Sequence, residues 1–164
     1  MKVLLLLRHA KSSWESAGLA DHDRLLNNRG KRDAPRMGKV LLEEGIVPEI
    51  IVSSSAKRAH STAKKVAKSS HYKGEVIIES SLYRGGPIEY LNVLRRQPDQ
   101  ARTVLMVGHN PDVEQLLEML TRKEIIMPTC SLAAINVPVE HWKNLTISSK
   151  AELRKVWRPK ELPD

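Results

Sequence analysis

The sequence has little of several residue types, and each shortage excludes a class of protein. There is one cysteine, Cys130, so the 164-residue chain can form no intramolecular disulfide and no cluster of thiolate metal ligands. Phenylalanine is absent and aromatic residues make up only 4%, which disfavours a stacking platform for single-stranded nucleic acid. No uninterrupted apolar run is long enough to cross a bilayer. We therefore expect a soluble, globular protein with no membrane partner.

The start of the chain and its length bear on location and domain organisation. Met1-Lys2 leads directly into an apolar segment, without the pattern of a secretory leader. Together with the single cysteine, this start predicts a cytoplasmic location. The length is typical of one domain, and no repeat or linker divides the sequence, so we expect residues 1–164 to form a single domain.

The formal net charge of +8 favours anionic partners through long-range attraction. Nucleic acid and phosphate esters are both anionic. The basic residues are spread along the chain and are not gathered into one arm, and most are expected on a solvated surface. With so few aromatic residues, a nucleic-acid partner is not expected.

Strand-like apolar runs alternate with amphipathic segments of helical spacing. The continuous apolar run 3–7 is typical of a strand covered on both faces in a parallel sheet. The predicted strands are 3–7, 49–53, 76–78, 103–107, 132–137 and 151–156, and the predicted helices lie within 34–45, 56–70, 87–94 and 110–120. This alternation predicts an α/β protein, a three-layer α/β/α sandwich with a mostly parallel sheet.

Three local features carry more specific expectations. Asn110 has the chemistry of a helix N-cap, with Pro111 at the first helical position. Pro35 is expected to mark a first turn or a kink in its helix. The segment 157–164 is expected to be extended.

Cationic and imidazole side chains follow three of the predicted strands. Arg8-His9 follow the first strand, Arg58 comes shortly after the second, and His109 follows the strand 103–107. Ligands of parallel sheets bind beyond the carboxyl ends of the strands. Guanidinium groups match phosphate oxygens, and a helix start after His109 would add backbone N–H donors. The sequence therefore predicts an electropositive pocket that holds two imidazoles.

Each of these residues alone has an ordinary explanation as a strand-end histidine, a helix-surface arginine or a residue before a cap. Their coincidence at one sheet edge favours a site. The remaining histidines have no such setting and are expected on the surface or in local packing: His22, His60, His71 and His141.

Four blocks in sequence order resemble the motifs of the histidine phosphatase superfamily. The blocks are Arg8-His9-Ala10-Lys11-Ser12, Asp23-Arg24-Leu25 with Gly30, Ser54-Ser55-Ala56-Lys57-Arg58-Ala59 with Thr62-Ala63, and Val107-Gly108-His109-Asn110-Pro111. The compact length is similar to the branch of SixA-type phosphohistidine phosphatases. The resemblance covers residues 1–137 and implies a phosphoglycerate mutase-like fold.

The resemblance also implies roles for individual residues. His9 would be the nucleophile, and Arg8, Arg58 and His109 would hold the phosphoryl oxygens. The two arginines are expected to lower the pKa of His9 and keep it neutral. Ser12 and Asn110 are further candidate substrate contacts.

The sequence departs from the family pattern in two places. Ala10 stands where the family usually has glycine after the nucleophilic histidine. Many members also carry an acidic proton donor between the second and third motifs. The nearest carboxylates, Glu79 and Glu89, have simpler explanations as strand-end and helix-surface charges, so the proton donor is unassigned.

The lack of an assigned proton donor affects which substrate is expected. An alkoxide leaving group needs a proton donor, whereas a phosphohistidine leaves as imidazole, whose ring can already carry the proton. This favours a phosphorylated protein histidine, for example on a phosphotransfer domain, as the partner. Two alternatives stay open: a phosphatase of small phosphate esters that uses the same His9, and a non-catalytic binder of phosphate or nucleic acid.

The sequence lacks the motifs that other classes of phosphatase require. Asn136 stands six places after Cys130, where a cysteine phosphatase needs arginine, and Asp21-His22-Asp23 does not follow a strand-like run. There is no phosphate-binding loop with its lysine and no metal-ligand spacing. A reaction without metal or cofactor is therefore expected.

Overall fold

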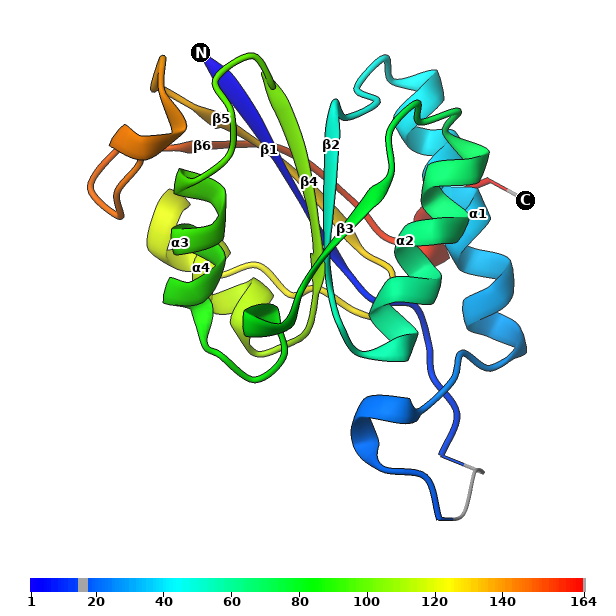
Figure 1. The fold of residues 1–164 in the computed structure, drawn as a ribbon. Coiled ribbons are helices and arrows are strands. Elements are labelled where there is room, and N and C mark those ends of the chain that lie inside the picture. Colours follow the sequence, from blue (N-terminus) through cyan, green and yellow to red (C-terminus); the bar gives the residue numbers. More distant parts are fainter. Residues whose placement is uncertain (15–17, 164) are drawn as a thin grey trace.

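The centre of the protein is a six-stranded mixed sheet in a computed structural model that describes residues 1–14 and 18–163. The strands are β1 (Lys2–Arg8), β2 (Ile50–Ser54), β3 (Val76–Glu79), β4 (Thr103–Gly108), β5 (Leu132–Val137) and β6 (Glu152–Trp157). Their spatial order is β3-β2-β4-β1-β5-β6 (Figure 1). The first four in this order are parallel to one another, while β5 is antiparallel to both of its neighbours. The prediction of a mostly parallel sheet is confirmed.

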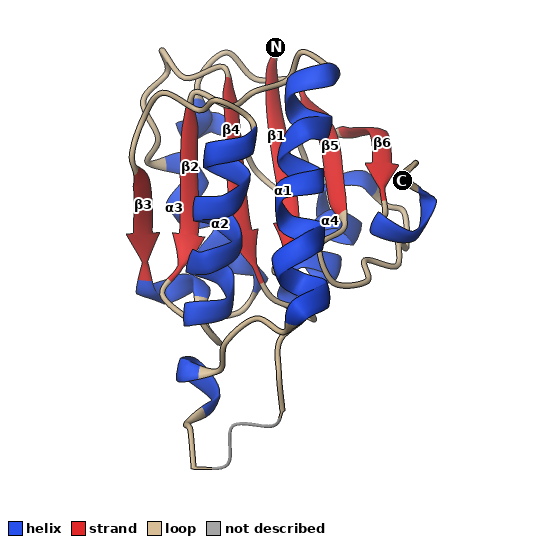
Figure 2. Cartoon of the chain, turned by 90° about the vertical axis from the view of Figure 1, so that its right-hand side faces the viewer, coloured by secondary structure: helices blue, strands red, loops and turns tan. Residues whose placement is uncertain are grey.

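Four α-helices cover the two faces of this sheet. They are α1 (Asn28–Glu43), α2 (Lys57–Ser69), α3 (Pro87–Arg95) and α4 (Asp112–Thr121). Figure 2 shows α1 and α2 in front of the sheet, with α3 and α4 behind it. The predicted α/β/α sandwich is therefore present. Within the described part of the chain, no helix combines the length and apolar character needed to traverse a bilayer.

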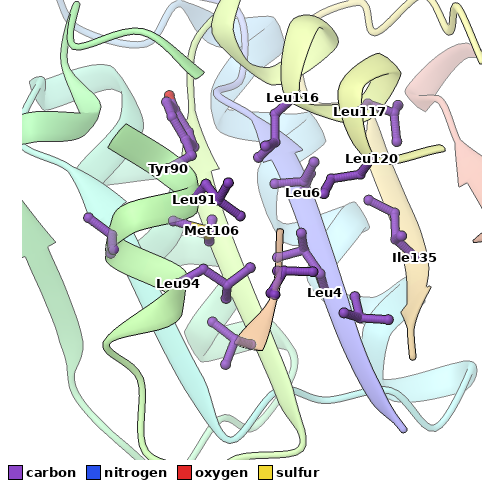
Figure 3. Close-up of a cluster of buried hydrophobic side chains, with 14 of the residues drawn as sticks. Leu4, Leu6, Tyr90, Leu91, Leu94, Met106, Leu116, Leu117, Leu120 and Ile135 are labelled. Atoms are coloured by element: carbon purple, nitrogen blue, oxygen red, sulfur yellow. The ribbon is translucent and has the colours of Figure 1, made fainter. Parts of the chain in front are cut away.

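The apolar run in β1 is buried on both sides. Leu4 and Leu6 pack with α3 and α4, and Leu5 and Leu7 pack with α1 and α2. Figure 3 shows the first of these clusters, in which leucines of α3 and α4 surround Leu4 and Leu6. Strand side chains alternate between faces, so a continuous apolar run is what a central strand requires.

The start of α1 lies against the backbone that follows β1. Asn27 caps the helix, since its side chain accepts a hydrogen bond from the Gly30 N–H at 2.9 Å. A Cβ on Gly30 would overlap the Lys11 carbonyl, so only glycine allows this approach. Pro35 lies inside the helix, beyond its first turn, because α1 begins earlier than the apolar spacing indicated.

The predicted cap of α4 is wrong. Pro111 occupies the cap position, the Asn110–Pro111 peptide is cis, and no side chain caps the helix. The Asn110 side chain instead donates to the Met127 carbonyl at 3.0 Å. The first helical hydrogen bond runs from Val113 N–H to the His109 carbonyl at 2.9 Å, which ties the start of α4 to the end of β4.

The C-terminal segment is less extended than predicted. Residues Pro159–Glu161 form a 3-10 turn, and the segment returns to α1. Arg36 on α1 donates to the Pro159 and Leu162 carbonyls, both at 3.4 Å. This long-range contact explains why the local proline pattern was misleading.

The carboxyl ends of β1, β2 and β4 meet at one edge of the sheet. The parallel register pairs Arg8 with Gly108 and Ser53 with Val107. The connection between β1 and α1 projects beyond this same edge and contains a 3-10 turn, Asp21–Asp23 (Figures 1 and 2). The predicted site residues therefore converge here.

Candidate active site

One cavity of about 200 Å³ brings together all six residues singled out in the sequence. The His9 and His109 rings lie with their centroids 5.1 Å apart, and Arg58 Nε lies 3.4 Å from His9 Nε2. The cavity is lined by Arg8, His9, Lys11, Ser12, Trp14, Arg24, Arg58, His109, Asn110 and Thr129. We call it the phosphate cavity, because its guanidinium groups suit an oxyanion.

The hydrogen bonds of His9 define which ring nitrogen can react. Nδ1 lies 2.7 Å from the Ala10 carbonyl oxygen, which can only accept, so Nδ1 carries the proton. In the neutral ring this leaves the lone pair on Nε2. Arg58 Nε donates towards this nitrogen. The unprotonated nitrogen of His9 is therefore Nε2, on the side of the ring that faces Arg58.

Thr62 on α2 holds the backbone on which His9 depends. Its hydroxyl accepts from Ala10 N–H at 2.9 Å and donates to the Arg58 carbonyl at 2.7 Å. Ala10 is fully buried and does not take the left-handed backbone conformation that favours glycine. The first departure from the family pattern therefore fits this backbone.

His109 is oriented by two residues that the sequence did not single out for this role. The Ser54 hydroxyl accepts from Ala56 N–H at 3.2 Å and also lies 2.8 Å from His109 Nε2. The other ring nitrogen, Nδ1, has no partner among the described residues. The Tyr90 hydroxyl accepts from the His109 backbone N–H at 3.0 Å. His109 is thus held at Nε2 and at its backbone, and its Nδ1 is left without a partner among the described residues.

Both imidazoles are held in the neutral form. Burial is the largest cause for each, and lowers the pKa of His9 to about 3 and that of His109 to about 4. For His9, the Ala10 hydrogen bond acts in the opposite direction, and the nearby Arg58 and Arg8 make smaller contributions. The pKa of His9 is lowered, as the sequence predicted, but the two arginines contribute less to this lowering than burial does.

These shifts predict that acid destabilises the fold. An unfolded histidine has an ordinary pKa, so below about pH 6.5 the unfolded chain binds more protons than the native one. The free energy of unfolding should then fall between pH 6.5 and 4 by about 1 kcal/mol per pH unit for each of the two histidines. Urea unfolding at pH 7 and pH 5 measures this loss. His109→Asn should lose less stability over this interval than the wild type, and an equal loss in both proteins would contradict the assignment.

Two arginines at the cavity are fixed by backbone carbonyls. Arg8 Nη1 donates to the Met127 carbonyl at 3.1 Å, and its buried Nε has no partner among the described residues. Arg58 is buried, and its Nη1 donates to the Asp21 carbonyl at 2.7 Å. Such anchoring fixes the positive charges in place before a ligand arrives.

A third guanidinium, Arg24, lines the phosphate cavity and was not among the predicted site residues. Its Nη2 donates to the Ser12 hydroxyl, and its guanidinium carbon lies 3.3 Å from the centroid of the Trp14 ring. Ser12 therefore accepts a hydrogen bond from a cavity arginine in addition to lining the cavity itself. Arg24 belongs to the second block that resembles the superfamily motifs, Asp23-Arg24-Leu25, and this position could have identified it as a site residue.

Asp21 joins these cations, although no pattern in the sequence indicated that it would lie here. Its carboxylate accepts from Arg58 at 3.0 Å, Arg24 at 3.0 Å and the Tyr83 hydroxyl at 2.8 Å. Burial would raise the pKa of Asp21, but the hydrogen bonds from Tyr83, Arg24 and Arg58 hold it well below its usual range. Asp21 is therefore a permanent anion that orients two cavity arginines. His22, beside it, packs edge-on against Tyr83 with centroids 4.8 Å apart.

A second cavity of about 250 Å³ adjoins the first and shares Arg58, His109 and Asn110 with it. It is also lined by Asp21, Tyr83, Arg84, Pro111 and Asp112. Asp112 accepts from Gly86 N–H at 3.2 Å, and burial raises the pKa of its carboxyl. Neither Glu79 nor Glu89 lines either cavity.

The described residues contain no group of three or more histidine, cysteine, aspartate or glutamate side chains placed to hold a metal ion. Cys130 is buried, and burial raises the pKa of its thiol. This cysteine is therefore a packing residue of the core beneath α1 and α2.

Comparisons with known proteins agree with this geometry. An uncharacterized chloroplastic protein of Arabidopsis thaliana is 33% identical over 150 residues, which are 85% of this chain and 68% of the relative. A profile of the histidine phosphatase superfamily (branch 1) matches residues 4–83. The chain belongs to the histidine phosphatase superfamily. A segment of 64 residues is also 39% identical to a 2,3-bisphosphoglycerate-dependent phosphoglycerate mutase of Arthrobacter, but it spans only 25% of that enzyme.

Solved structures of this superfamily show the same fold. A candidate SixA phosphohistidine phosphatase from Agrobacterium tumefaciens superposes with a TM-score of 0.83 at 25% identity, covering 96% of this chain and 98% of the other. The protein histidine phosphatase SixA complexed with tungstate gives a TM-score of 0.81 at 19% identity, covering 98% and 99%. The fold is therefore the phosphoglycerate mutase-like fold of SixA-type histidine phosphatases, which confirms the predicted fold class.

Proposed function

We propose that this histidine phosphatase hydrolyses phosphohistidine on a protein substrate, through a phosphoryl group carried by His9. The observation that carries the proposal is the neutral His9 ring, whose Nδ1 proton is tied to Ala10 while Nε2 lies beside Arg58. The likeness to structures described as phosphohistidine phosphatases supports the same substrate class.

The first step is an in-line displacement at phosphorus. The lone pair of His9 Nε2 forms the new N–P bond, and the bond between phosphorus and the substrate nitrogen breaks. Arg8, Arg24 and Arg58 surround the cavity and would stabilise the charge on the equatorial oxygens. His109 Nδ1 has no partner among the described residues, and in the tautomer in which Ser54 donates to Nε2 it would supply a further N–H donor.

The second step releases phosphate. Water attacks the phosphorus, the Nε2–P bond breaks, and the electron pair returns to Nε2 of His9. The proton lost by water passes to the departing phosphate. His9 ends in its starting tautomer because Nδ1 keeps its proton on the Ala10 carbonyl throughout.

The phosphate cavity is lined by no carboxylate among the described residues, and this favours phosphohistidine as the substrate. Asp21, which binds the cavity arginines, is held as an anion by its hydrogen bonds and cannot supply a proton to a leaving group. An alkoxide would need a donor, worth about 10² to 10⁴ in rate. An imidazole whose other nitrogen is protonated leaves as a neutral ring and needs no such help.

A second candidate function, hydrolysis of small phosphate esters, is favoured by one observation. Asp112 lines the adjoining cavity, and its raised pKa is in the direction that a general acid requires. In this alternative His9 keeps its role and Asp112 protonates the leaving oxygen.

The substitution Asp112→Asn separates the two candidates. Asparagine is isosteric, and its oxygen can still accept from Gly86 N–H. We expect turnover of phosphohistidine to stay within about threefold of the wild type, because its leaving group needs no acid. Steady-state kinetics on free phosphohistidine and on an alkyl phosphate measure both reactions. The ester phosphatase would be favoured by two results together: the wild type prefers the alkyl phosphate, and Asp112→Asn lowers turnover of the alkyl phosphate about 10²-fold.

A further inference from the structure

A small hollow lies beside the phosphate cavity on the projecting connection between β1 and α1. It has a volume of about 160 Å³ and is lined by Ser13, Trp14, Leu19, Asp21 and Arg24. Trp14 and Arg24 also line the phosphate cavity. The hollow is therefore separated from the phosphate cavity by a wall that these two stacked side chains form.

Two walls of the hollow are apolar and open to solvent. Trp14 is 75% exposed and Leu19 is 44% exposed. Leu25, farther along the same connection, is also exposed. Large apolar side chains gathered beside a cavity and left in water mark a surface that a partner covers. Trp14 is already held in place by its stacking on Arg24, so little conformational entropy would be lost when it is covered.

We propose that this hollow binds an apolar side chain of the protein that carries the phosphohistidine, close in space to the phosphorylated residue. The inference rests on the proposed function, which places the phosphoryl group in a cavity that shares Trp14 and Arg24 with the hollow. A small phosphorylated molecule that fits the phosphate cavity does not need the hollow. A protein or peptide extends beyond the phosphate cavity, so that one of its side chains can reach Trp14 and Leu19.

The other neighbouring cavity is a poorer place for an apolar group. Asp21 lines both spaces, but this cavity adds the charged side chains of Arg58, Arg84 and Asp112 and is not lined by Trp14 or Leu19. Burying an apolar side chain there would remove water from more charges without replacing their hydrogen bonds. The apolar contact is therefore expected at Trp14 and Leu19.

The test uses short phosphohistidine peptides with a glycine and serine background. One leucine is placed at each position in turn on either side of the phosphohistidine, and free phosphohistidine serves as the small substrate. We expect leucine at one or two adjacent positions to raise kcat/KM about fivefold to tenfold over the serine peptide, mainly through KM. An equal kcat/KM for all peptides would overturn the inference, while turnover of free phosphohistidine reports separately on the proposed function.

Substitutions at Leu19 assign the preference to the hollow. Leu19→Ser should remove the preference for leucine and leave turnover of free phosphohistidine unchanged, and Leu19→Met should retain most of the preference. Ile147→Ser is the matched control, because Ile147 is similarly exposed at 40% but lies on the connection between β5 and β6 at the opposite end of the sheet. A leucine preference that survives in Leu19→Ser, or is lost equally in Ile147→Ser, would contradict a site at this hollow.

Discussion

Replacing His9 by alanine is expected to reduce phosphatase turnover at least about 10⁴-fold, on the scale of other nucleophile deletions. The substitution removes the proposed nucleophile, Nε2, which lies 3.4 Å from Arg58 Nε. The arginines that line the cavity are retained. Single-turnover and steady-state assays with phosphohistidine measure the loss.

The control for this substitution is His141→Ala. His141 bonds to Asp99 at 2.8 Å and is not among the residues that line the phosphate cavity or the adjoining cavity. Its replacement should leave turnover unchanged. If His9→Ala kept wild-type turnover, the covalent mechanism would be wrong. If the wild type bound phosphate or nucleic acid without any turnover, the non-catalytic alternative would be correct.

Truncation of Arg58 should cause the second largest loss, about 10² to 10³ in kcat/KM. Arg58 is buried between His9 and Asp21, so its charge acts in a site with little water. Arg58→Ala removes that charge and also leaves the Asp21 carboxylate without one of its partners. Activity should therefore fall through transition-state stabilisation, with a larger effect on kcat than on KM.

Arg58→Lys tests the geometry of this contact. Lysine keeps the charge, but its three donors sit on one nitrogen and do not reproduce the planar fork by which the guanidinium reaches His9 and both the carbonyl and the carboxylate of Asp21. We expect an intermediate loss of about 10-fold to 10²-fold. Arg95→Ala is the matched control, since Arg95 lies on the solvent side of α3 and bonds to the Lys143 carbonyl. Equal losses in Arg58→Ala and Arg95→Ala would indicate a general effect on folding.

The parts of the site that follow from regular structure were predictable from the sequence. The buried run in β1 and the apolar stripes of the helices carry their own periodicity, so the sandwich could be inferred. Parallel strands end at a common edge, and this rule predicts that Arg8-His9, Arg58 and His109 lie together. The ordered motifs include the same four residues.

The sequence could not predict contacts that depend on the irregular connection between β1 and α1. Asp21 reaches Arg58 and Tyr83, which are 37 and 62 residues away, only because this connection folds back over the sheet edge. No periodic pattern specifies such a turn. The predicted N-cap of α4 was wrong for a related reason. The Asn110 side chain donates to a carbonyl 17 residues further along the chain and does not cap its own helix.

The main cause of the His9 pKa shift also could not be predicted from the sequence. Charges nearby in the motifs suggested electrostatic lowering by Arg8 and Arg58. In the structure burial contributes most, and this burial depends on tertiary packing that brings Arg58 and His109 against the ring. Residue types alone therefore indicated the direction of the shift but not its origin.

The most direct measurement is the location of a phosphoryl group trapped on the enzyme during turnover of phosphohistidine. An alkaline quench preserves phosphohistidine, peptide mass spectrometry identifies the residue, and phosphorus NMR distinguishes the two ring nitrogens. We expect phosphate on Nε2 of His9, because Nδ1 is hydrogen-bonded to the Ala10 carbonyl. Phosphate on His109 or on Nδ1 of His9 would contradict it.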